Sequence, residues 1–374
     1  MSKNNMPNSA TPERVALDLR PLLDREPGGV GAYTRSLFAA LEELPEIECY
    51  PVITGSSLGS IEPGEFPNLR RLPLPNPLLN VLIKFSGLPR LDRLARVRHY
   101  LLPNWNFLGL ARQSKLTLVV HDLSFERNIK WFSQRQRLWH RAVNPRRLVE
   151  RADRVIAVSE WTKRDLLELY GTPAEKISVI YPVPDRPPVD LPFPVVLPER
   201  FILFLGAVEE RKNPLSLLRA FEQIAARHPE THLIIAGRFG YGGERVAAAA
   251  AASPYVSRIR LTGYVPLSVR HALYRQAAVF VYPSFYEGFG IPLVEAMHAG
   301  APVVTGNRSA MPEVVGDAGI LADPLDINQI ALALDEVLSN SSFAAALAAK
   351  GKERAALFPA SMAPALGKLF VGES

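Results

Sequence analysis

Cysteine is nearly absent from this sequence. Cys49 is the only cysteine in 374 residues, so no disulfide can form within the chain. The 7 histidines and the single cysteine do not cluster at the spacing of a structural zinc site. Both absences favour a reducing compartment, and we expect a cytoplasmic protein.

Long apolar segments are also missing. The longest stretches without a charged side chain, such as residues 49–61, reach only 13 residues, whereas a membrane-spanning helix needs about 20. Residues 1–14 lack the apolar core of a secretory signal. We therefore expect no segment that crosses a membrane.

Two motifs are absent, and each absence argues against a kind of chemistry. The chain has no Walker-type phosphate loop, which argues against a nucleoside triphosphatase. It has no Asp-x-Asp triplet, so no obvious carboxylate pair can hold a metal ion against a diphosphate. We expect neither a metal nor another cofactor.

The excess positive charge lies entirely in the first half of the chain. Residues 1–190 hold 27 Lys and Arg against 21 Asp and Glu, which accounts for the whole net charge of +6. Residues 127–154 alone hold nine basic side chains against two acidic ones. This segment suits an anionic membrane, a phosphate-bearing substrate or nucleic acid, but a solvated helix face has the same pattern. Because no recognition module accompanies it, we expect no nucleic-acid partner.

A proline-rich segment divides the chain into two similar halves. Seven of the 33 prolines fall within residues 182–198, where they disfavour both a helix and a central strand. Apolar runs that alternate with helical patterns lie at residues 14–20, 116–122, 154–159, 176–182, 201–207, 231–237, 259–265, 278–284 and 301–306. Such runs indicate parallel sheets covered by helices on both faces, with one of the helices expected over residues 131–150. We predict an α/β protein of two doubly wound domains, residues 1–185 and 200–356, joined by a linker at 186–199.

Ligands of such sheets bind beyond the carboxyl ends of the strands, which makes the residues after each strand candidates. Glu287, Gly288 and Gly290 follow one predicted strand and precede a helix that contains Glu295. The glycines allow a close backbone approach, and the start of the helix offers free N–H groups to an anion. No Lys or Arg lies at helical spacing to pair with either glutamate. This favours contacts between both carboxylates and ligand hydroxyls over a purely structural role at the helix start.

Other candidates follow other predicted strands. Arg211 and Lys212 are adjacent at the start of a helix and suit a diphosphate, although surface pairs of this kind are common. Gly29 and Gly31 have the first spacing of a dinucleotide fingerprint but lack its third glycine, so a simple flexible turn is the alternative. His121 ends a strand and is expected to face the cleft between the domains; a hydrogen-bonded core histidine is the alternative.

Several stretches resemble family 4 retaining glycosyltransferases of the GT-B fold. The donor half of that family is matched by GAVEERKNPLSLLRAF (206–221), LTGYV (261–265), YPSFYEGFGIPLVEAMHAGAPVV (282–304) and SAMPEVVGDAGIL (309–321). The first half continues the resemblance with PGGVGAYTRSLFAAL, VVHDLSFE and ADRVIAVSEWTKRDL. The resemblance implies two Rossmann-like domains that face each other across a cleft. It also implies that the last residues, 357–374, pack back onto the first domain.

The resemblance implies roles for individual residues as well. Glu287 would lie next to the transferred sugar, and Glu295 would hold the ribose hydroxyls of the nucleotide. Arg211 and Lys212 would hold the diphosphate, although many members carry an arginine at the position of Ala207. The remaining donor-site residues would be His121, Gly288, Phe289, Gly290 and Ile291 at the sugar, Gly29 and Gly206 near the phosphates, and Tyr264 and Val265 at the base.

The activity implied by the resemblance is a metal-independent, retaining hexosyl transfer. The donor would be a nucleotide diphosphate sugar, and the acceptor a glycan or a lipid-linked oligosaccharide. VHDLSFE and EERKN are similar to bacterial mannosyltransferases of O-antigen and exopolysaccharide assembly, which makes GDP-mannose the expected donor. A nucleotide-sugar epimerase of the same fold is the main alternative, and a dehydrogenase is suggested only by Gly29 and Gly31.

The basic first half suits an acceptor that carries a lipid diphosphate at the inner face of the cell membrane. The apolar segment LLNVLIKFSGL (78–88) precedes Arg90, Arg93, Arg96 and Arg98, a pattern typical of an interfacial helix on an anionic membrane. A buried helix with a charged end has the same pattern. We expect a cytoplasmic protein with peripheral membrane contact.

Overall fold

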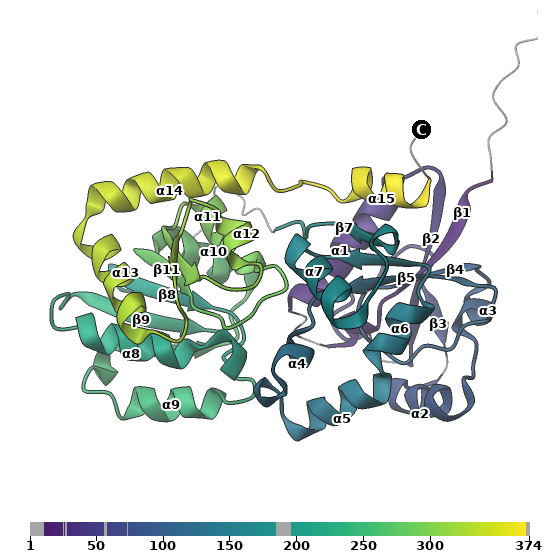
Figure 1. Cartoon of the computed structure of the whole chain (residues 1–374), viewed down its shortest axis with the longest axis horizontal. Coiled ribbons are helices and arrows are strands. Elements are labelled where there is room, and N and C mark those ends of the chain that lie inside the picture. Colours follow the sequence, from purple (N-terminus) through teal and green to yellow (C-terminus); the bar gives the residue numbers. More distant parts are fainter. Residues whose placement is uncertain are drawn as a thin grey trace, which may run out of the picture.

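Two parallel sheets form the frame of the protein (Figure 1). The computed structural model describes residues 11–24, 26, 28–55, 58–72, 74–184 and 196–371, so the predicted linker at 186–199 lies largely outside the described residues. The first sheet has the strand order β3-β2-β1-β4-β5-β6-β7, and the second has the order β10-β9-β8-β11-β12-β13. The strand order reverses next to β1 and next to β8, as in Rossmann-like domains. The predicted α/β class, with two doubly wound domains, is confirmed.

The described strands include four that the apolar pattern did not predict. The first sheet contains β1 (Glu13–Asp18), β2 (Ile47–Thr54), β3 (Arg70–Leu72), β4 (His99–Leu102), β5 (Lys115–Val120), β6 (Arg154–Ala157) and β7 (Ile177–Val179). The second contains β8 (Arg200–Leu205), β9 (Thr231–Ala236), β10 (Ile259–Gly263), β11 (Val279–Tyr282), β12 (Val303–Gly306) and β13 (Ile320–Ala322). The unpredicted strands are β2, β3, β4 and β13. Pro51 interrupts the signal of β2, and β3 contains two arginines in three residues. β4 and β13 are as short as β6 and β7, which the pattern did predict.

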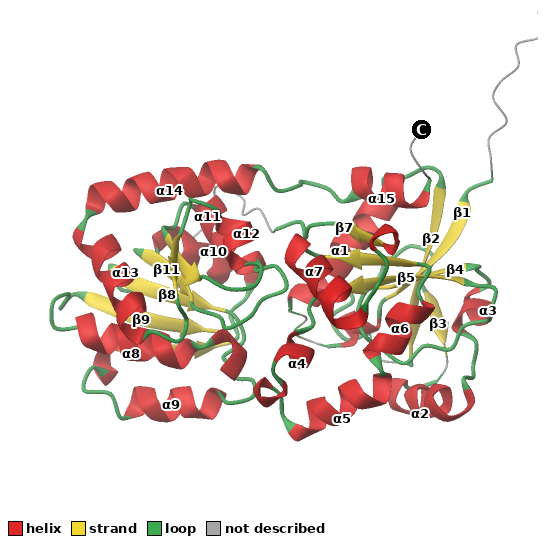
Figure 2. Cartoon of the chain, viewed as in Figure 1, coloured by secondary structure: helices red, strands yellow, loops and turns green. Residues whose placement is uncertain are grey.

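Helices cover both sheets, as Figure 2 shows. The first half contains α1 (Gly29–Glu42), α2 (Asn76–Ser86), α3 (Leu91–Ala95), α4 (Ser124–Arg127), α5 (Gln134–Val143), α6 (Pro145–Arg151) and α7 (Glu160–Tyr170). The second half contains α8 (Pro214–Ile224), α9 (Gly243–Ala251), α10 (Leu267–Gln276), α11 (Ile291–Ala299), α12 (Met311–Val315), α13 (Ile327–Ser339), α14 (Ser341–Ala356) and α15 (Ala363–Phe370). Within the described part of the chain, no single helix is long and apolar enough to cross a membrane.

The single helix expected over residues 131–150 is two helices. Asn144 separates α5 from α6 with φ at 57°, in the left-handed region, and its side chain accepts a hydrogen bond from the Arg147 N–H. Pro145 then occupies the first turn of α6, where its missing N–H costs nothing. The Asn144–Pro145 pair therefore ends one helix and begins the next, although the apolar pattern continues through both.

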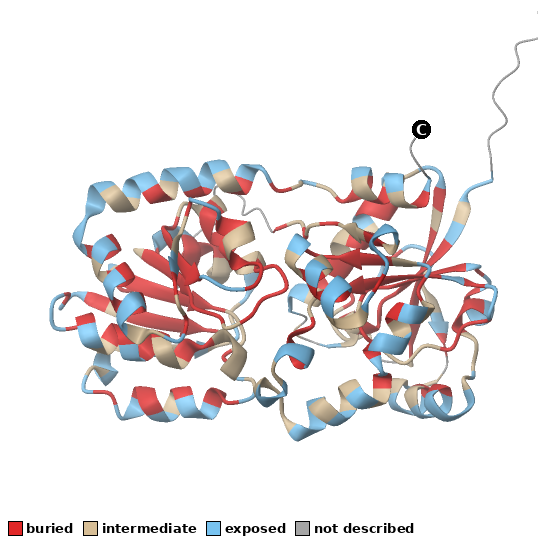
Figure 3. Cartoon of the chain, in the orientation of Figure 1, coloured by how far each residue is buried: buried red, intermediate tan, exposed pale blue. Residues whose placement is uncertain are grey.

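The core explains why the strands are almost continuously apolar. Leu116, Leu118, Val119 and Val120 of β5 are all fully buried, so residues on both faces of the strand are covered. Figure 3 shows the same burial along the central strands of both sheets. Because side chains on both faces are covered, the strands place only their terminal residues and the loops that follow them within reach of a ligand.

The last helix lies on the first domain, although its sequence follows the second. After α14 the chain crosses between the domains and ends in α15 (Figure 1). Leu366 is fully buried, and the Phe370 ring lies 4.9 Å from the His99 ring, centroid to centroid. The Ser361 hydroxyl donates to the Glu43 carboxylate at 2.9 Å. The C-terminal segment is therefore part of the first domain's packing.

We predict that Leu366→Ala lowers the free energy of unfolding of the first domain by about 2–5 kcal/mol, because it leaves a cavity beneath α15. All four tryptophans lie before residue 162, so urea unfolding followed by tryptophan fluorescence reports on that domain. Val371→Ala is the matched control, since Val371 is 50% exposed. Equal unfolding curves for the two variants would show that α15 does not stabilise the first domain.

Candidate active site

A cavity of about 350 Å³ lies between the two domains and receives loops from the carboxyl ends of both sheets. Gly31 does not line it, whereas every donor-site residue implied by the resemblance does: Gly29, His121, Gly206, Arg211, Lys212, Tyr264, Val265, Glu287, Gly288, Phe289, Gly290, Ile291 and Glu295. Residues from α1 and from the loops after β5, β8, β10 and β11 thus meet at one place. Their proximity is a structural fact, while their individual roles remain predictions.

Glu287 is buried in the loop between β11 and α11 and has cationic partners. Arg211 lies 3.2 Å and Lys212 3.8 Å from its carboxylate oxygens. The Ser284 hydroxyl donates to the same carboxylate at 2.9 Å. The expectation that no cation pairs with Glu287 was therefore wrong. Helical spacing excluded only local partners, whereas these cations come from the loop after the neighbouring strand β8.

These contacts set the charge of the site. Burial would raise the pKa of Glu287, but the charges of Arg211 and Lys212 outweigh it and hold the pKa below its ordinary value. Burial opposes the charge of Arg211, while Glu287 and Glu209 raise its pKa. Burial also opposes the charge of Lys212, but Glu287 and Tyr282 raise its pKa above the ordinary value. Glu287 is thus an ionised carboxylate near neutral pH, held between two permanent cations.

Helix α11 adds the positive end of its dipole to the same cavity. Its N-cap is Gly290, at φ 103° and without a capping side chain, so the first N–H groups of the helix have no side-chain acceptor there. Such a helix start favours an anionic ligand. Together with Arg211 and Lys212, it provides a positively polarised wall opposite the first domain.

Glu295 lies one turn into α11 and is also paired. The Tyr274 hydroxyl donates to its carboxylate at 3.0 Å, and an Arg270 guanidinium nitrogen lies 3.5 Å from it. Sequence reasoning missed Arg270 and Tyr274, because both lie on α10 and reach Glu295 only through the packing of α10 on α11. It also missed Tyr282, whose hydroxyl is hydrogen-bonded to Lys212; its place at the end of β11 was the available signal.

His121 contributes a hydrogen-bond acceptor from the first domain. Its Nε2 lies 2.8 Å from the Pro103 carbonyl oxygen, which requires the proton on Nε2 and leaves Nδ1 as the acceptor. Burial lowers the pKa of the imidazole, against the opposing effects of that bond and of Asp122. Asp122, which also lines the cavity, has a lowered pKa because the charge of Arg211 and hydrogen bonds from Ser124 outweigh burial. The neutral ring suits a ligand hydroxyl.

Gly288 brings the two domains into contact at the cavity. A Cβ atom at this position would lie only 1.7 Å from the His121 carbonyl oxygen, so the close approach requires glycine. On the opposite wall, a Cβ atom at Gly29 would lie 3.4 Å from the Ile291 side chain. The cavity is therefore complete only when the domains are closed on each other.

Comparison with known sequences identifies the family. The family profile "Glycosyl transferases group 1" matches residues 193–354, and "Glycosyltransferase Family 4" matches residues 27–186. The chain is 31% identical over 278 residues to O-antigen chain mannosyltransferase B of Escherichia coli, covering 70% of this chain and 71% of that one. This protein is a family 4 glycosyltransferase. The transferase also shares 28% identity over 222 residues with the serotype-specific mannosyltransferase WbdA of Escherichia coli, of which it spans only 27%.

Solved structures agree on the GT-B fold of this glycosyltransferase. Sucrose-phosphate synthase from Thermosynechococcus elongatus superposes with a TM-score of 0.73 at 21% identity, covering 96% of this chain and 98% of that one. Anabaena HepE in complex with UDP and glucose superposes with a TM-score of 0.70 at 15% identity, over 96% and 100% of the two chains. At these identities the likeness establishes the fold alone.

We predict that acidification destabilises the glycosyltransferase partly through His121. Its pKa is lowered from 6.5 in the folded protein, so the unfolded chain binds more protons below about pH 6.5, and stability is lost as the pH falls. His121→Asn removes this contribution. The fall in Tm between about pH 7.5 and pH 5.5 is then smaller than in the wild type. If the fall in Tm is the same in His121→Asn as in the wild type, His121 has the same pKa in the folded and the unfolded state.

Proposed function

We propose that this glycosyltransferase moves mannose from GDP-mannose to a glycan or lipid-linked oligosaccharide acceptor, with retention of the anomeric configuration. The observation that carries the proposal is the arrangement of Glu287, Glu295 and the Arg211–Lys212 pair around one interdomain cavity. Mannose is chosen because O-antigen chain mannosyltransferase B is 31% identical over 70% of this chain.

The proposed donor spans the cavity along these groups. Arg211, Lys212 and the start of α11 face the diphosphate, and Glu295 accepts hydrogen bonds from the ribose hydroxyls. The base lies toward Tyr264 and Val265, near the outer edge of the cavity, where Tyr264 is 54% exposed. The hexose lies between Glu287 and the backbone from Gly288 to Ile291, within reach of His121 Nδ1.

The proposed transfer needs no covalent intermediate and no metal. An acceptor hydroxyl oxygen forms a bond to the anomeric carbon while the bond from that carbon to the diphosphate oxygen breaks. The hydroxyl proton passes to the departing phosphate oxygen on the same face of the sugar. Arg211 and Lys212 stabilise the charge that develops on the diphosphate, and the ionised Glu287 stabilises the positive charge at the anomeric carbon.

We predict that GDP-mannose and GDP raise the Tm of the protein more than UDP-glucose or ADP-glucose do, because a ligand bound only by the folded form stabilises it. Glu295→Gln should weaken GDP binding roughly tenfold, since it removes a charge-assisted contact to the ribose. Glu353→Gln is the control, because Glu353 lies on the exposed side of α14 and does not line the cavity.

Product analysis separates the proposed reaction from its rivals. The product with a mannosyl acceptor should be an α-glycoside by NMR, as in GDP-mannose, and the rate should persist in excess EDTA. A changed free nucleotide sugar without a glycoside would indicate epimerisation. Loss of turnover with EDTA and its recovery with a divalent ion would refute the metal-independent route.

We further propose that α2 docks the enzyme on the cytoplasmic face of the membrane, next to a lipid-diphosphate acceptor. Its outer side presents large apolar side chains to solvent: Leu78 is 48%, Val81 54% and Phe85 81% exposed. Their spacing places them on one face of the helix, and Lys84 lies beside Phe85. Arg93 and Arg96 follow on and after α3 and are exposed as well, which suits anionic headgroups.

We predict that the protein floats with phosphatidylglycerol vesicles at low salt and that Val81→Glu/Phe85→Glu abolishes flotation, because the substituted face no longer enters the interface. Leu332→Glu on α13 is the control, since Leu332 is 65% exposed on the other domain. If the α2 variant floats as well as the wild type, or if the wild type does not float, the proposed membrane contact is wrong.

A further inference from the structure

The loop that carries Glu287 contacts the first domain at several points. The Phe285 ring stacks on Trp131, with ring centroids 5.9 Å apart and planes 5° from parallel. The Tyr286 hydroxyl donates to Asp165 on α7. The Gly288 carbonyl accepts hydrogen bonds from the hydroxyls of Ser159 and Thr162, at the start of α7. Loop 285–288 therefore depends on the position of α7.

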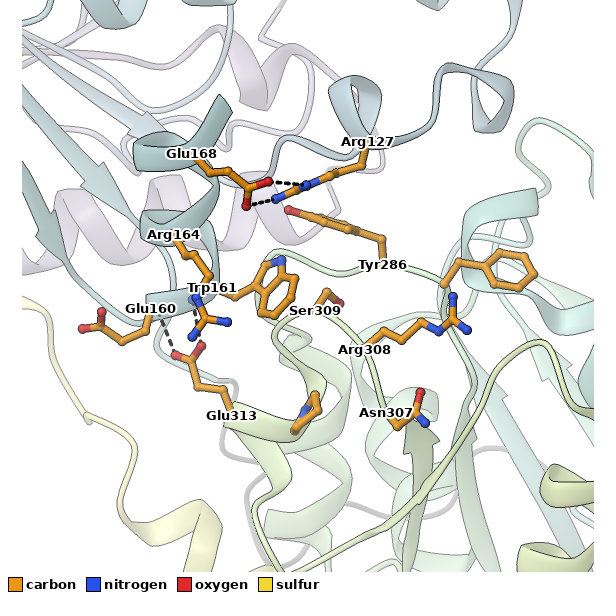
Figure 4. Close-up of a pocket in the computed structure, with 12 residues that line it drawn as sticks. Arg127, Glu160, Trp161, Arg164, Glu168, Tyr286, Asn307, Arg308, Ser309 and Glu313 are labelled. Atoms are coloured by element: carbon orange, nitrogen blue, oxygen red, sulfur yellow. Dashed lines mark hydrogen bonds and ion pairs between the residues drawn. The ribbon is translucent and has the colours of Figure 1, made fainter. Parts of the chain in front are cut away.

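A glutamate of the second domain holds the start of α7 in turn. Glu313 on α12 accepts the Glu160 N–H at 2.9 Å on one carboxylate oxygen and the Trp161 N–H at 3.0 Å on the other (Figure 4). Ser159 accepts the next N–H, from Thr162, at 3.0 Å. The first three N–H groups of an 11-residue helix are thus satisfied, two of them from across the domain boundary. The helix dipole favours a carboxylate at this end.

The segment that leads into α12 holds the other side of the Glu287 loop. The Glu287 N–H donates to the Ser309 hydroxyl oxygen at 2.9 Å, and its carbonyl accepts from the Ala310 N–H at 3.4 Å. Glu313 is itself anchored, because Arg354 donates to its main-chain carbonyl at 2.6 Å. One short stretch, residues 309–313, therefore binds the Glu287 backbone through Ser309 and Ala310 and also carries the Glu313 carboxylate.

We propose that Glu313 is a positioning residue for sugar transfer. It connects the start of α7 to residues 309–313, which bind the Glu287 backbone. Ser159 and Thr162 then hydrogen-bond to the Gly288 carbonyl, while Ser309 accepts the Glu287 N–H. These hydrogen bonds place the Glu287 carboxylate and the Gly288 backbone at the donor sugar. Glu313 does not line the donor cavity; it lines a separate interdomain groove on the far side of loop 285–288. This inference rests on the proposed role of Glu287 at the donor sugar.

The kinetic test compares Glu313→Ala with Glu353→Ala. We expect Glu313→Ala to lower kcat about tenfold or more and to change the donor KM much less, because it shifts the backbone of Glu287 and Gly288 at the sugar, whereas Arg211 and Lys212 lie on their own loop after β8. Glu313→Gln, which keeps one acceptor oxygen, should retain more of kcat. Glu353→Ala should match the wild type. A rise in KM alone, or no change in kcat, would overturn the proposal.

A double-substitution cycle asks whether Glu313 acts through α7. If it does, adding Ser159→Ala to Glu313→Ala lowers kcat little further, because the hydrogen bonds to the Gly288 carbonyl are already lost. If the fold losses of kcat from the two single substitutions multiply in the double variant, the two residues act independently, contrary to the proposal.

Hydrogen exchange tests the same linkage without any donor and so separates it from the proposed function. Glu313→Ala should speed amide exchange both at residues 160–162 and at residues 286–289, and Glu353→Ala at neither. Faster exchange at 160–162 alone, or at neither segment, would overturn the positioning role. If the wild type fails to use GDP-mannose while both segments respond, the donor assignment fails and the linkage stands.

Discussion

The buried Glu287 carboxylate between Arg211 and Lys212 is the interaction on which the active site depends. A carboxylate buried without partners would be strongly destabilising, so the loops after β8 and β11 have to meet. The parallel sheet meets this requirement by making β8 and β11 neighbours with their carboxyl ends at the same edge. An incoming diphosphate then shares cations that are already oriented by Glu287 and by the Tyr286 carbonyl.

The second constraint is that neither domain forms the site alone. Gly288 approaches the His121 carbonyl more closely than any side chain would permit. The same residue is hydrogen-bonded to Ser159 and Thr162, so the sugar-facing loop takes its backbone position from both domains. The segment between α14 and α15 links the second domain covalently to the first, on which α15 packs. The cavity therefore requires the contact between the two domains that this structure shows.

Sequence reasoning succeeded where the physical signal is local. Strands buried on both faces show as apolar runs, which is why β5, β8 and β9 were recognised. β2 was missed because Pro51 is unusual within a strand, and β3 because two of its three residues are arginines. Length alone does not separate β4 and β13 from β6 and β7, which are as short and were recognised. The candidate glutamates were found from their place after a strand. Their supposed lack of cationic partners was an error, because Arg211 and Arg270 reach them from other elements.

The sequence by itself determined the class of the fold, the two-domain organisation and the family, because apolar periodicity and contiguous motifs are properties of neighbouring residues. Only the tertiary structure decided which charges pair, which ring nitrogen of His121 is protonated and how α7 and α12 hold the Glu287 loop. Those features depend on contacts between residues far apart in the chain, such as Glu160 and Glu313. The spacing of residues along a chain does not specify such distances until the sheets, and then the domains, have packed.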